Sequence, residues 1–301
     1  MFPLTKIEQA HQRIKDVVVN TPFSYAPFLS GESGVEVFLK KENLQITGAF
    51  KLRGAFNKIA SLSDAERAQG VVAASAGNHA QGVAYSAQHF GIKAVIIMPD
   101  STPLTKVNGV RHFGAEVILA GNNYDEAYAY ATKYGEENGL VFVHPFEDDE
   151  VIAGQGTVAL EILEAADDLD AVIVPVGGGG LIGGGMAWLD GRRNIVAVEP
   201  ETSCALNAAL AAGAPCDVEV SGVAANALGA RRIGDICFDL AQSTGVTSVL
   251  VGDAAITEAQ VLLLRELRPW GAPAGATALV ALPPGAHPPG PMDRGWVRLL
   301  R

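Results

Sequence analysis

The sequence lacks the features that mark several common protein classes. Its three cysteines, Cys204, Cys216 and Cys237, have no metal-ligand spacing and make no even set for a disulfide framework. It has no run of lysine or arginine, and its formal net charge is −11, which argues against a nucleic-acid partner. The histidines are scattered and indicate no metal cage. We therefore expect a reduced, cytoplasmic protein with neither a bound metal nor a nucleic-acid partner.

Signal-peptide and membrane signatures are also missing. Charged residues from Lys6 to Lys15 leave no room for the apolar core of a signal peptide. The segment from Ala171 to Leu189 is uncharged and long enough to raise the question of a membrane span. Its seven glycines and one proline divide it into a strand, a turn and the start of a helix. We expect no membrane partner.

Short apolar runs alternate with segments of helical length along most of the chain. Strands are predicted at 71–74, 94–98, 116–119, 140–143, 171–176 and 195–198, and helices between them, for example at 79–90, 124–138 and 156–165. This alternation predicts an α/β fold of open parallel sheets covered by helices, and the length favours two domains. Prolines crowd the chain from about residue 268, which predicts a tail with little helix or strand.

Three short motifs carry the candidate chemistry. In the stretch from Thr47 to Gly54, Lys51 stands just before a predicted helix, where a desolvated amine can form a Schiff base with a carbonyl. The stretch from Ser75 to His79 lies at a strand-to-helix turn. Four glycines from Gly177 follow a predicted strand, and their backbone can approach a phosphate held by the next helix. Together the motifs predict a cofactor that has both an aldehyde and a phosphate.

The glycine run also fits another class of protein. Gly178, Gly180 and Gly183 have the spacing of the dinucleotide fingerprint, and Glu199 lies near the end of the next predicted strand. This alternative predicts a nicotinamide-dependent oxidoreductase. It places the fingerprint in the middle of the chain instead of at the first strand, and it gives Lys51 no role.

Taken together, the motifs resemble a known family. The stretches 47–55, 75–82, 152–157 and 175–180 look like those of the threonine/serine dehydratases, which are pyridoxal-phosphate enzymes of the tryptophan-synthase β-subunit type, related to serine racemase. The resemblance implies a small α/β domain at residues 50–145 and a large one from 1–49 plus 146–301. It places pyridoxal 5'-phosphate in the cleft between them and implies a homodimer.

The resemblance also assigns roles to individual residues. Lys51 would be the catalytic residue and carry the cofactor, and Phe50 would pack beside the cofactor ring. Asn78 would hydrogen-bond the ring hydroxyl oxygen. The other cofactor-binding residues would be Gly177, Gly178, Gly179, Gly180, Gly222 and Val223. The substrate would bind at Ser75, Ala76, Gly77, Asn78 and His79, with His79 mainly a structural residue of the turn.

The reaction implied by this family is the elimination of water from L-threonine or L-serine, which gives a 2-oxo acid and ammonia. The amine of Lys51 would remove the proton from the substrate Cα. Racemases similar to this family place a second hydroxyl at the position of Ala76. Because a methyl group cannot donate a proton, we expect elimination and not a serine or threonine racemase.

Four departures from the family pattern define a second alternative. Ala49 replaces a serine, Ala205 stands where relatives that bind a cation have an acidic ligand, and Ala272 replaces another acidic residue. With Ala205 there, Glu199 is expected to be a surface carboxylate at a strand end. Fourth, the Ser/Cys-Gly-Gly-Asn motif that follows the last strand of relatives is absent between 280 and 301, which predicts a missing or rewritten strand. The alternative is a pyridoxal-phosphate-binding protein with impaired catalysis.

Overall fold

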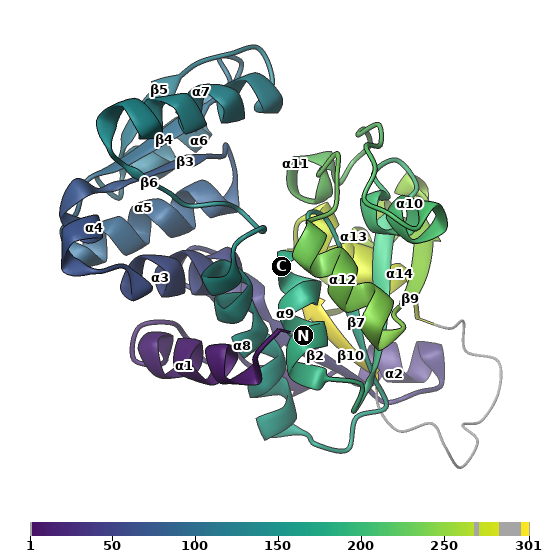
Figure 1. The fold of residues 1–301 in the computed structure, drawn as a ribbon. Helices are drawn as coiled ribbons and strands as arrows, with labels where there is room; N and C mark the ends of the chain where they lie inside the picture. Colours follow the sequence, from purple (N-terminus) through teal and green to yellow (C-terminus); the bar gives the residue numbers. More distant parts are fainter. Residues whose placement is uncertain (1, 268–270, 283–295, 301) are drawn as a thin grey trace.

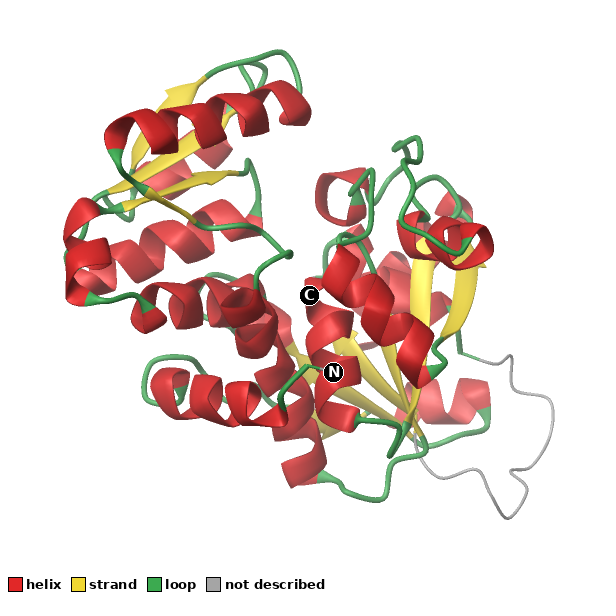
Figure 2. Ribbon diagram, in the orientation of Figure 1, coloured by secondary structure: helices red, strands yellow, loops and turns green. Residues whose placement is uncertain are grey.

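The computed structural model describes residues 2–267, 271–282 and 296–300. These residues form two open sheets with helices on both faces, seen as two groups of strands in Figure 1 and Figure 2. One sheet has the strand order β5-β4-β3-β6, and the other has the order β1-β2-β10-β7-β8-β9. Apart from the antiparallel pair β1–β2, the strand pairs in this part of the chain are parallel. The predicted α/β fold is confirmed.

The four-stranded sheet and its helices form the small lobe. Alternate residues of β3 explain why both of its faces are covered: Val71 and Ala73 pack with residues of α5, whereas Val72 and Ala74 pack with residues of α7. The small lobe contains α4 (Asp64–Gln69), β3 (Val71–Ala74), α5 (Asn78–Phe90), β4 (Ala94–Met98), α6 (Leu104–Arg111), β5 (Glu116–Leu119), α7 (Tyr124–Asn138) and β6 (Val141–Phe142).

The six-stranded sheet is the centre of the large lobe. Val172 and Val174 of β7 pack into the core formed with α8, α9 and α12, and Ile173 packs on the opposite face with residues of α13 and α14. The elements that precede the small lobe are α1 (Leu4–Ile14), β1 (Phe23–Tyr25), α2 (Pro27–Ser33), β2 (Val37–Lys41) and η1 (Glu42–Leu44). Those that follow it are β7 (Ala171–Pro175), α9 (Gly180–Leu189), β8 (Asn194–Pro200), α10 (Ala205–Ala212), α11 (Ala225–Leu228), α12 (Asp235–Thr244), β9 (Thr247–Val251), α13 (Asp253–Leu262), η2 (Leu263–Leu267), α14 (Pro273–Val280) and β10 (Trp296–Leu300).

Two long helices connect the lobes. α3 (Lys51–Ser61) packs against α5 of the small lobe and against α8 (Asp149–Ala165), and α8 packs in turn against α9 and α1. α8 begins seven residues before the predicted start at Gly156, because the side chain of Asp148 accepts hydrogen bonds from the N–H groups of Glu150 and Val151. The sheets follow the predicted two-domain pattern, and the division at residues 50 and 145 stays a prediction.

The prediction of an irregular tail was wrong for the part that the structure describes. Residues 273–280 form α14, and residues 296–300 form β10, which pairs in parallel with both β2 and β7. A proline at the first turn is compatible with a helix, so Pro273 starts α14 instead of preventing it. Residues 268–270, 283–295 and 301, on which the same prediction falls, lie outside the described residues. Within the described ranges, the helices are too short or too polar to cross a membrane.

Candidate active site

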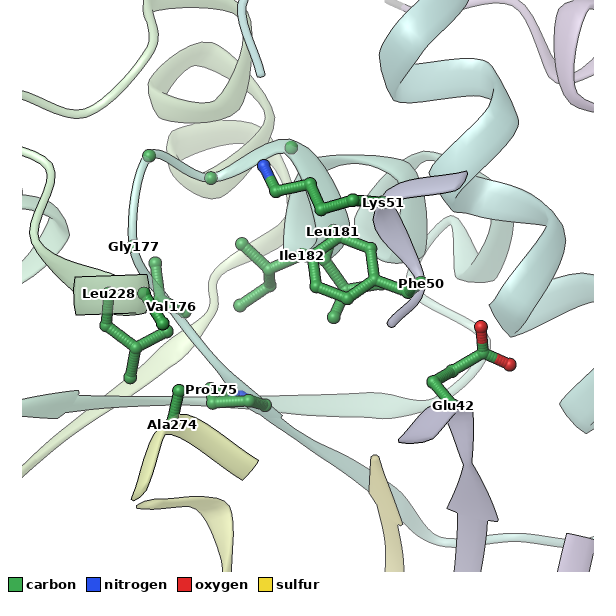
Figure 3. A pocket seen from close by; sticks show the side chains of 14 residues that line it. Glu42, Phe50, Lys51, Pro175, Val176, Gly177, Leu181, Ile182, Leu228 and Ala274 are labelled. Carbon is green, nitrogen blue, oxygen red and sulfur yellow. The ribbon is translucent and has the colours of Figure 1, made fainter. Parts of the chain in front are cut away.

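Lys51 is the first residue of α3 and projects into a cavity between the two lobes. The Nζ atom of Lys51 donates a hydrogen bond of 2.7 Å to the carbonyl oxygen of Pro145, and lies 5.4 Å from the centroid of the Phe50 ring. Figure 3 shows the Lys51 side chain reaching from α3 toward the loop that runs from Gly177 into α9. The amine predicted to be reactive therefore faces the predicted phosphate cradle.

The glycine loop joins β7 to α9 and has no space for side chains at its centre. A Cβ atom on Gly178 would lie 2.3 Å from the ring of Phe146. Gly179 has φ +96°, and its Cβ would lie 2.5 Å from the Sγ atom of Cys237. Glycine at both positions lets the loop pass tightly between its neighbours, and the first N–H groups of α9 follow at once, as in an anion site.

A second cavity joins the asparagine-containing turn to the other two motifs. The turn follows β3 and leads into α5, and the N–H of Gly77 donates to the Oγ atom of Ser75 at 3.1 Å. All five residues from Ser75 to His79 line this cavity together with Lys51 and Gly178. Lys51 and Gly178 also line the first cavity, with Phe50 and the rest of the glycine loop. The structure therefore brings the three predicted motifs together.

The cavity around the turn is suited to anions. Its described lining contains two lysines, Lys51 and Lys106, and no acidic side chain. The N-terminus of α5 opens toward it at Asn78, and the partial positive charge of a helix N-terminus favours a carboxylate. These features favour an anionic group in this cavity.

His79 is a buried, neutral residue of the turn. It is 3% exposed, and its Nε2 atom donates to the carbonyl oxygen of Val143 at 2.9 Å. Burial, followed by the positive charge of nearby Lys51, lowers the pKa of His79 to about 3. The same two causes lower the pKa of His144 to about 4. Both rings are therefore neutral at physiological pH.

Two predicted residues lie apart from the cavities, and several residues that line them were not predicted. Gly222 and Val223 line neither cavity; the N–H of Val223 donates to Asp253. The neighbouring segment 225–228 supplies lining residues in their place. Lys106, Tyr124, Phe146 and Asn226 line the second cavity and were not predicted. Phe146 had a usable signal, because ligands bind beyond the carboxyl ends of parallel strands and Phe146 follows β6.

The prediction that Glu199 is a surface carboxylate was wrong. Glu199 is fully buried, and its two oxygens accept hydrogen bonds of 2.8 Å from the N–H groups of Leu206 and Asn207 in the first turn of α10. Burial raises the pKa of Glu199 to about 7, although these two N–H groups lower it. Because Glu199 is fully buried, a ribose has no access to its carboxylate, which removes one support of the dinucleotide alternative. Within the described residues, no cluster of three or more His, Cys, Asp or Glu could hold a metal ion.

The fold and these cavities define an α/β protein with a binding site between two parallel sheets. The model of a family described as "Pyridoxal-phosphate dependent enzyme" matches residues 14–294. An L-threonine ammonia-lyase of Thermotoga maritima is 45% identical over 94% of this chain and 71% of its own length. A biosynthetic L-threonine dehydratase of Pasteurella multocida is 42% identical over 90% of this chain, which spans 53% of that longer protein. The structure of maize serine racemase matches with a TM-score of 0.92 and 31% identity, covering 98% of this chain and 92% of the racemase.

The chain belongs to the family of pyridoxal-phosphate-dependent enzymes. Its fold is that of the family's fold type II, and pyridoxal 5'-phosphate is the cofactor. The residues present fit this cofactor on two observations of the structure. The loop from Gly177 to Gly180 lines the cavity with backbone alone at the start of α9, where a helix N-terminus favours a phosphate, and a lysine reaches toward this loop from beside an aromatic ring.

Proposed function

We propose that the protein is an ammonia-lyase that eliminates water from a β-hydroxy amino acid, L-threonine or L-serine, to give a 2-oxo acid and ammonia. The observation that carries this proposal is the shared lining of the two cavities, in which Lys51 stands between the glycine loop and the turn from Ser75 to His79. The names of the two relatives above support the same reaction.

We assign the residue roles as follows. Lys51, beside Phe50, would hold the cofactor, and the loop from Gly177 to Gly180 would bind its phosphate. Asn78 would bind the cofactor ring. Ser75 and the first N–H groups of α5 would orient the substrate carboxylate. Gly222 and Val223 line neither cavity. Their part in the site would be to precede the segment 225–228, which supplies lining residues.

The proton transfer is assigned to Lys51. When bound, pyridoxal phosphate supplies an electron sink for charge that develops at the substrate Cα. The amine of Lys51 would take the Cα proton, since it is the lysine that both cavities share. His79 would take no part in this proton transfer. The lowered pKa of His79 makes it a poor base near neutral pH, and its Nε2 atom already donates to the carbonyl oxygen of Val143.

The same cavity favours elimination over racemisation. A racemase needs a second proton donor on the face of the substrate opposite the lysine. Ala76 lines the cavity at the position where similar racemases place a hydroxyl, and a methyl group donates no proton. We therefore propose a lyase, even though a serine racemase matches the fold closely.

The structure removes one of the grounds for the alternative, a cofactor-binding protein with impaired catalysis. That alternative was based partly on a missing final strand, and β10 occupies a position between β2 and β7. The Ser/Cys-Gly-Gly-Asn motif is still absent from the sequence between 280 and 301. A neutral hydroxyl or thiol at the cofactor ring contributes only about 1 kcal/mol as a hydrogen bond, so we propose that turnover survives its absence.

A visible spectrum of the purified protein with pyridoxal phosphate, followed before and after L-threonine is added, tests the proposal. We expect a bound-cofactor band that changes with threonine while 2-oxobutanoate and ammonia accumulate. A stable band without product would favour the impaired cofactor-binding protein. The appearance of D-threonine or D-serine as the main product would favour a racemase.

We also propose, on the family resemblance, that the protein works as a homodimer in the cytoplasm. The cysteines are unpaired within the described residues, as expected for a reducing compartment. Light scattering of the purified protein gives the mass of the assembly, and a mass of one chain would contradict the dimer.

A further inference from the structure

Four charged side chains lie sealed behind the helix that carries Lys51. Lys40 of β2, Glu42 of η1, Arg53 of α3 and Glu161 of α8 are each at most 4% exposed. We call them the four-charge cluster; two cations and two carboxylates make it formally neutral. Because a buried ion pair adds little net stability over an apolar pair of the same size, stability alone is a weak reason for this arrangement.

Arg53 is the centre of the cluster. Its Nε and Nη2 atoms donate to the two oxygens of Glu42 at 2.8 and 2.9 Å. Its Nη1 and Nη2 atoms donate to the two oxygens of Glu161 at 2.6 and 2.8 Å. The Nζ atom of Lys40 lies 2.6 Å from the same Glu161. A guanidinium held by a carboxylate on each side can neither rotate nor shift without losing paired hydrogen bonds.

This anchor acts on the turn of α3 that begins at Lys51. Two residues along a helix turn the side-chain direction by about 200°, so Arg53 and Lys51 point to opposite sides of the same turn. The backbones of α3 and α8 also touch here, because a Cβ atom on Gly154 would lie only 2.5 Å from the carbonyl oxygen of Arg53. Glu42, held by Arg53, lines the same cavity as Lys51. The cluster therefore fixes the rotation of the first turn of α3.

We propose that Arg53 is a positioning residue for Lys51, and that the neutral four-charge cluster sets the direction and the electrostatic surroundings of the Lys51 amine. This inference rests on the role of Lys51 in the proposed function. Other titratable or charged groups also face Lys51, from the walls of its cavities or close beside it: Glu42, His79, Lys106, Tyr124 and His144.

Two variants of opposite charge test the electrostatic part. Lys40→Met and Glu161→Gln remove the same 2.6 Å ion pair, so both should lower Tm. Lys40→Met leaves the cluster with a net charge of −1, and Glu161→Gln leaves it with +1. In the enzyme loaded with pyridoxal phosphate, the pH midpoint of the visible cofactor band reports protonation of the Lys51 nitrogen. We expect this midpoint to rise in Lys40→Met and to fall in Glu161→Gln, by on the order of half a pH unit.

Arg53→Lys tests the positioning part, because it keeps the positive charge and loses the two-sided hydrogen bonding. We expect kcat to fall at least about tenfold with KM nearly unchanged, and the cofactor band to shift or broaden. The matched control is Lys58→Met, on the same helix α3, which removes a 2.6 Å ion pair to Asp148. The control should lower Tm slightly and leave both kcat and the band unchanged.

The outcomes separate this inference from the proposed function. If the wild-type protein binds no pyridoxal phosphate, the proposed function fails. If the wild type binds it, but the two charge variants move the midpoint in the same direction or not at all, the cluster does not set the surroundings of Lys51. A wild-type kcat and spectrum in Arg53→Lys would overturn the positioning role. If Arg53→Lys fails to fold, Lys40→Met and Glu161→Gln still test whether the cluster sets the electrostatic surroundings of Lys51.

Discussion

The two sides of the first turn of α3 satisfy their polar groups in different ways. On the sealed side, Arg53 has protein partners for its donors and lies among buried elements. On the cavity side, Lys51 shares its space with a glycine loop and with the N-termini of α5 and α9, whose first N–H groups are left over by helix geometry. Side chains that are buried among their partners hold the fold, whereas groups that line a cavity are placed where a ligand can reach them.

The largest effect should come from the cavity side. Lys51→Ala should lower turnover on threonine about ten-thousand-fold, because it removes both the proposed cofactor attachment and the proposed base. Tm should change by only a few degrees, since Lys51 is half-buried and Ala is a good helix former. Turnover is followed by 2-oxobutanoate, and folding by near-UV circular dichroism. Substantial residual activity would assign the proton transfer to another group.

A substitution on the sealed side should mainly lower stability. Arg53→Met removes the partner of two buried carboxylates, Glu42 and Glu161, and should lower the free energy of unfolding by about 3–5 kcal/mol. Urea unfolding measures this loss. Lys58→Met, whose ion pair with Asp148 is partly exposed, should cost no more than about 1 kcal/mol. Equal losses in the two variants would show that burial does not distinguish the two ion pairs.

The glycine loop offers a test between these extremes. Gly179→Ala should lower the free energy of unfolding by about 1–3 kcal/mol, since it places a side chain at φ +96° and against Cys237. It should also weaken the binding of pyridoxal phosphate more than tenfold, as measured by titration of the cofactor band. The control is Gly185→Ala in the same helix α9, where a Cβ atom would meet nothing within 4 Å. Normal cofactor affinity in Gly179→Ala would argue against the phosphate cradle.

An effect that appears only as the pH changes sharpens the contrast between buried carboxylates with and without a cationic partner. Glu161 contacts two cations, whereas Glu199 is held only by backbone N–H groups, and burial raises its pKa to about 7. Because the folded pKa lies above the unfolded value, the contribution of Glu199 to stability is present below about pH 4.5 and is lost as the pH rises through 7. Glu199→Gln should remove this loss.

The measurement is the difference in the free energy of unfolding between wild type and Glu199→Gln at several pH values. From pH 4.5 to 7.5 this difference should change by about 1–3 kcal/mol, in favour of the variant at high pH. Taking the difference between the two proteins cancels the contribution of the histidines to the pH dependence. His79 is one of them, because its lowered pKa makes stability fall as the pH drops below about 6.5. A difference that is constant with pH would show that folding does not raise the pKa of Glu199.

Local signals in the sequence predicted the parts of the structure that depend on local chemistry. The sequence from Ser63 to Glu66 has the pattern of a capping box, and the structure shows both of its reciprocal hydrogen bonds at the start of α4. The turn from Ser75 to His79 and the glycine loop each follow a strand, and Lys51 starts a helix, as predicted. The two strands belong to different sheets, so the meeting of the three motifs depends on how the lobes face each other, which no local signal gives.

The features that were missed depend on contacts distant in the sequence. The partners of Arg53 lie 11 and 108 residues away, and no periodicity links them. Glu199 was predicted at the surface because an isolated glutamate is rarely buried, and its hydrogen bonds come from a helix that begins after it. β10 was missed because the proline-rich composition around it hid a strand that pairs with the distant strands β2 and β7.

The position of β10 also has a consequence for how the chain folds. The four strands of the small-lobe sheet lie within residues 71–142, so this sheet can form from one continuous stretch of chain. The six-stranded sheet instead receives its inner strand from residues 296–300, paired with β2 at residues 37–41. Until these residues arrive, the facing edges of β2 and β7 stay unpaired, and open edges invite association between chains. We therefore expect the small lobe to order first and the large lobe to close late, when β10 joins the two halves of its sheet.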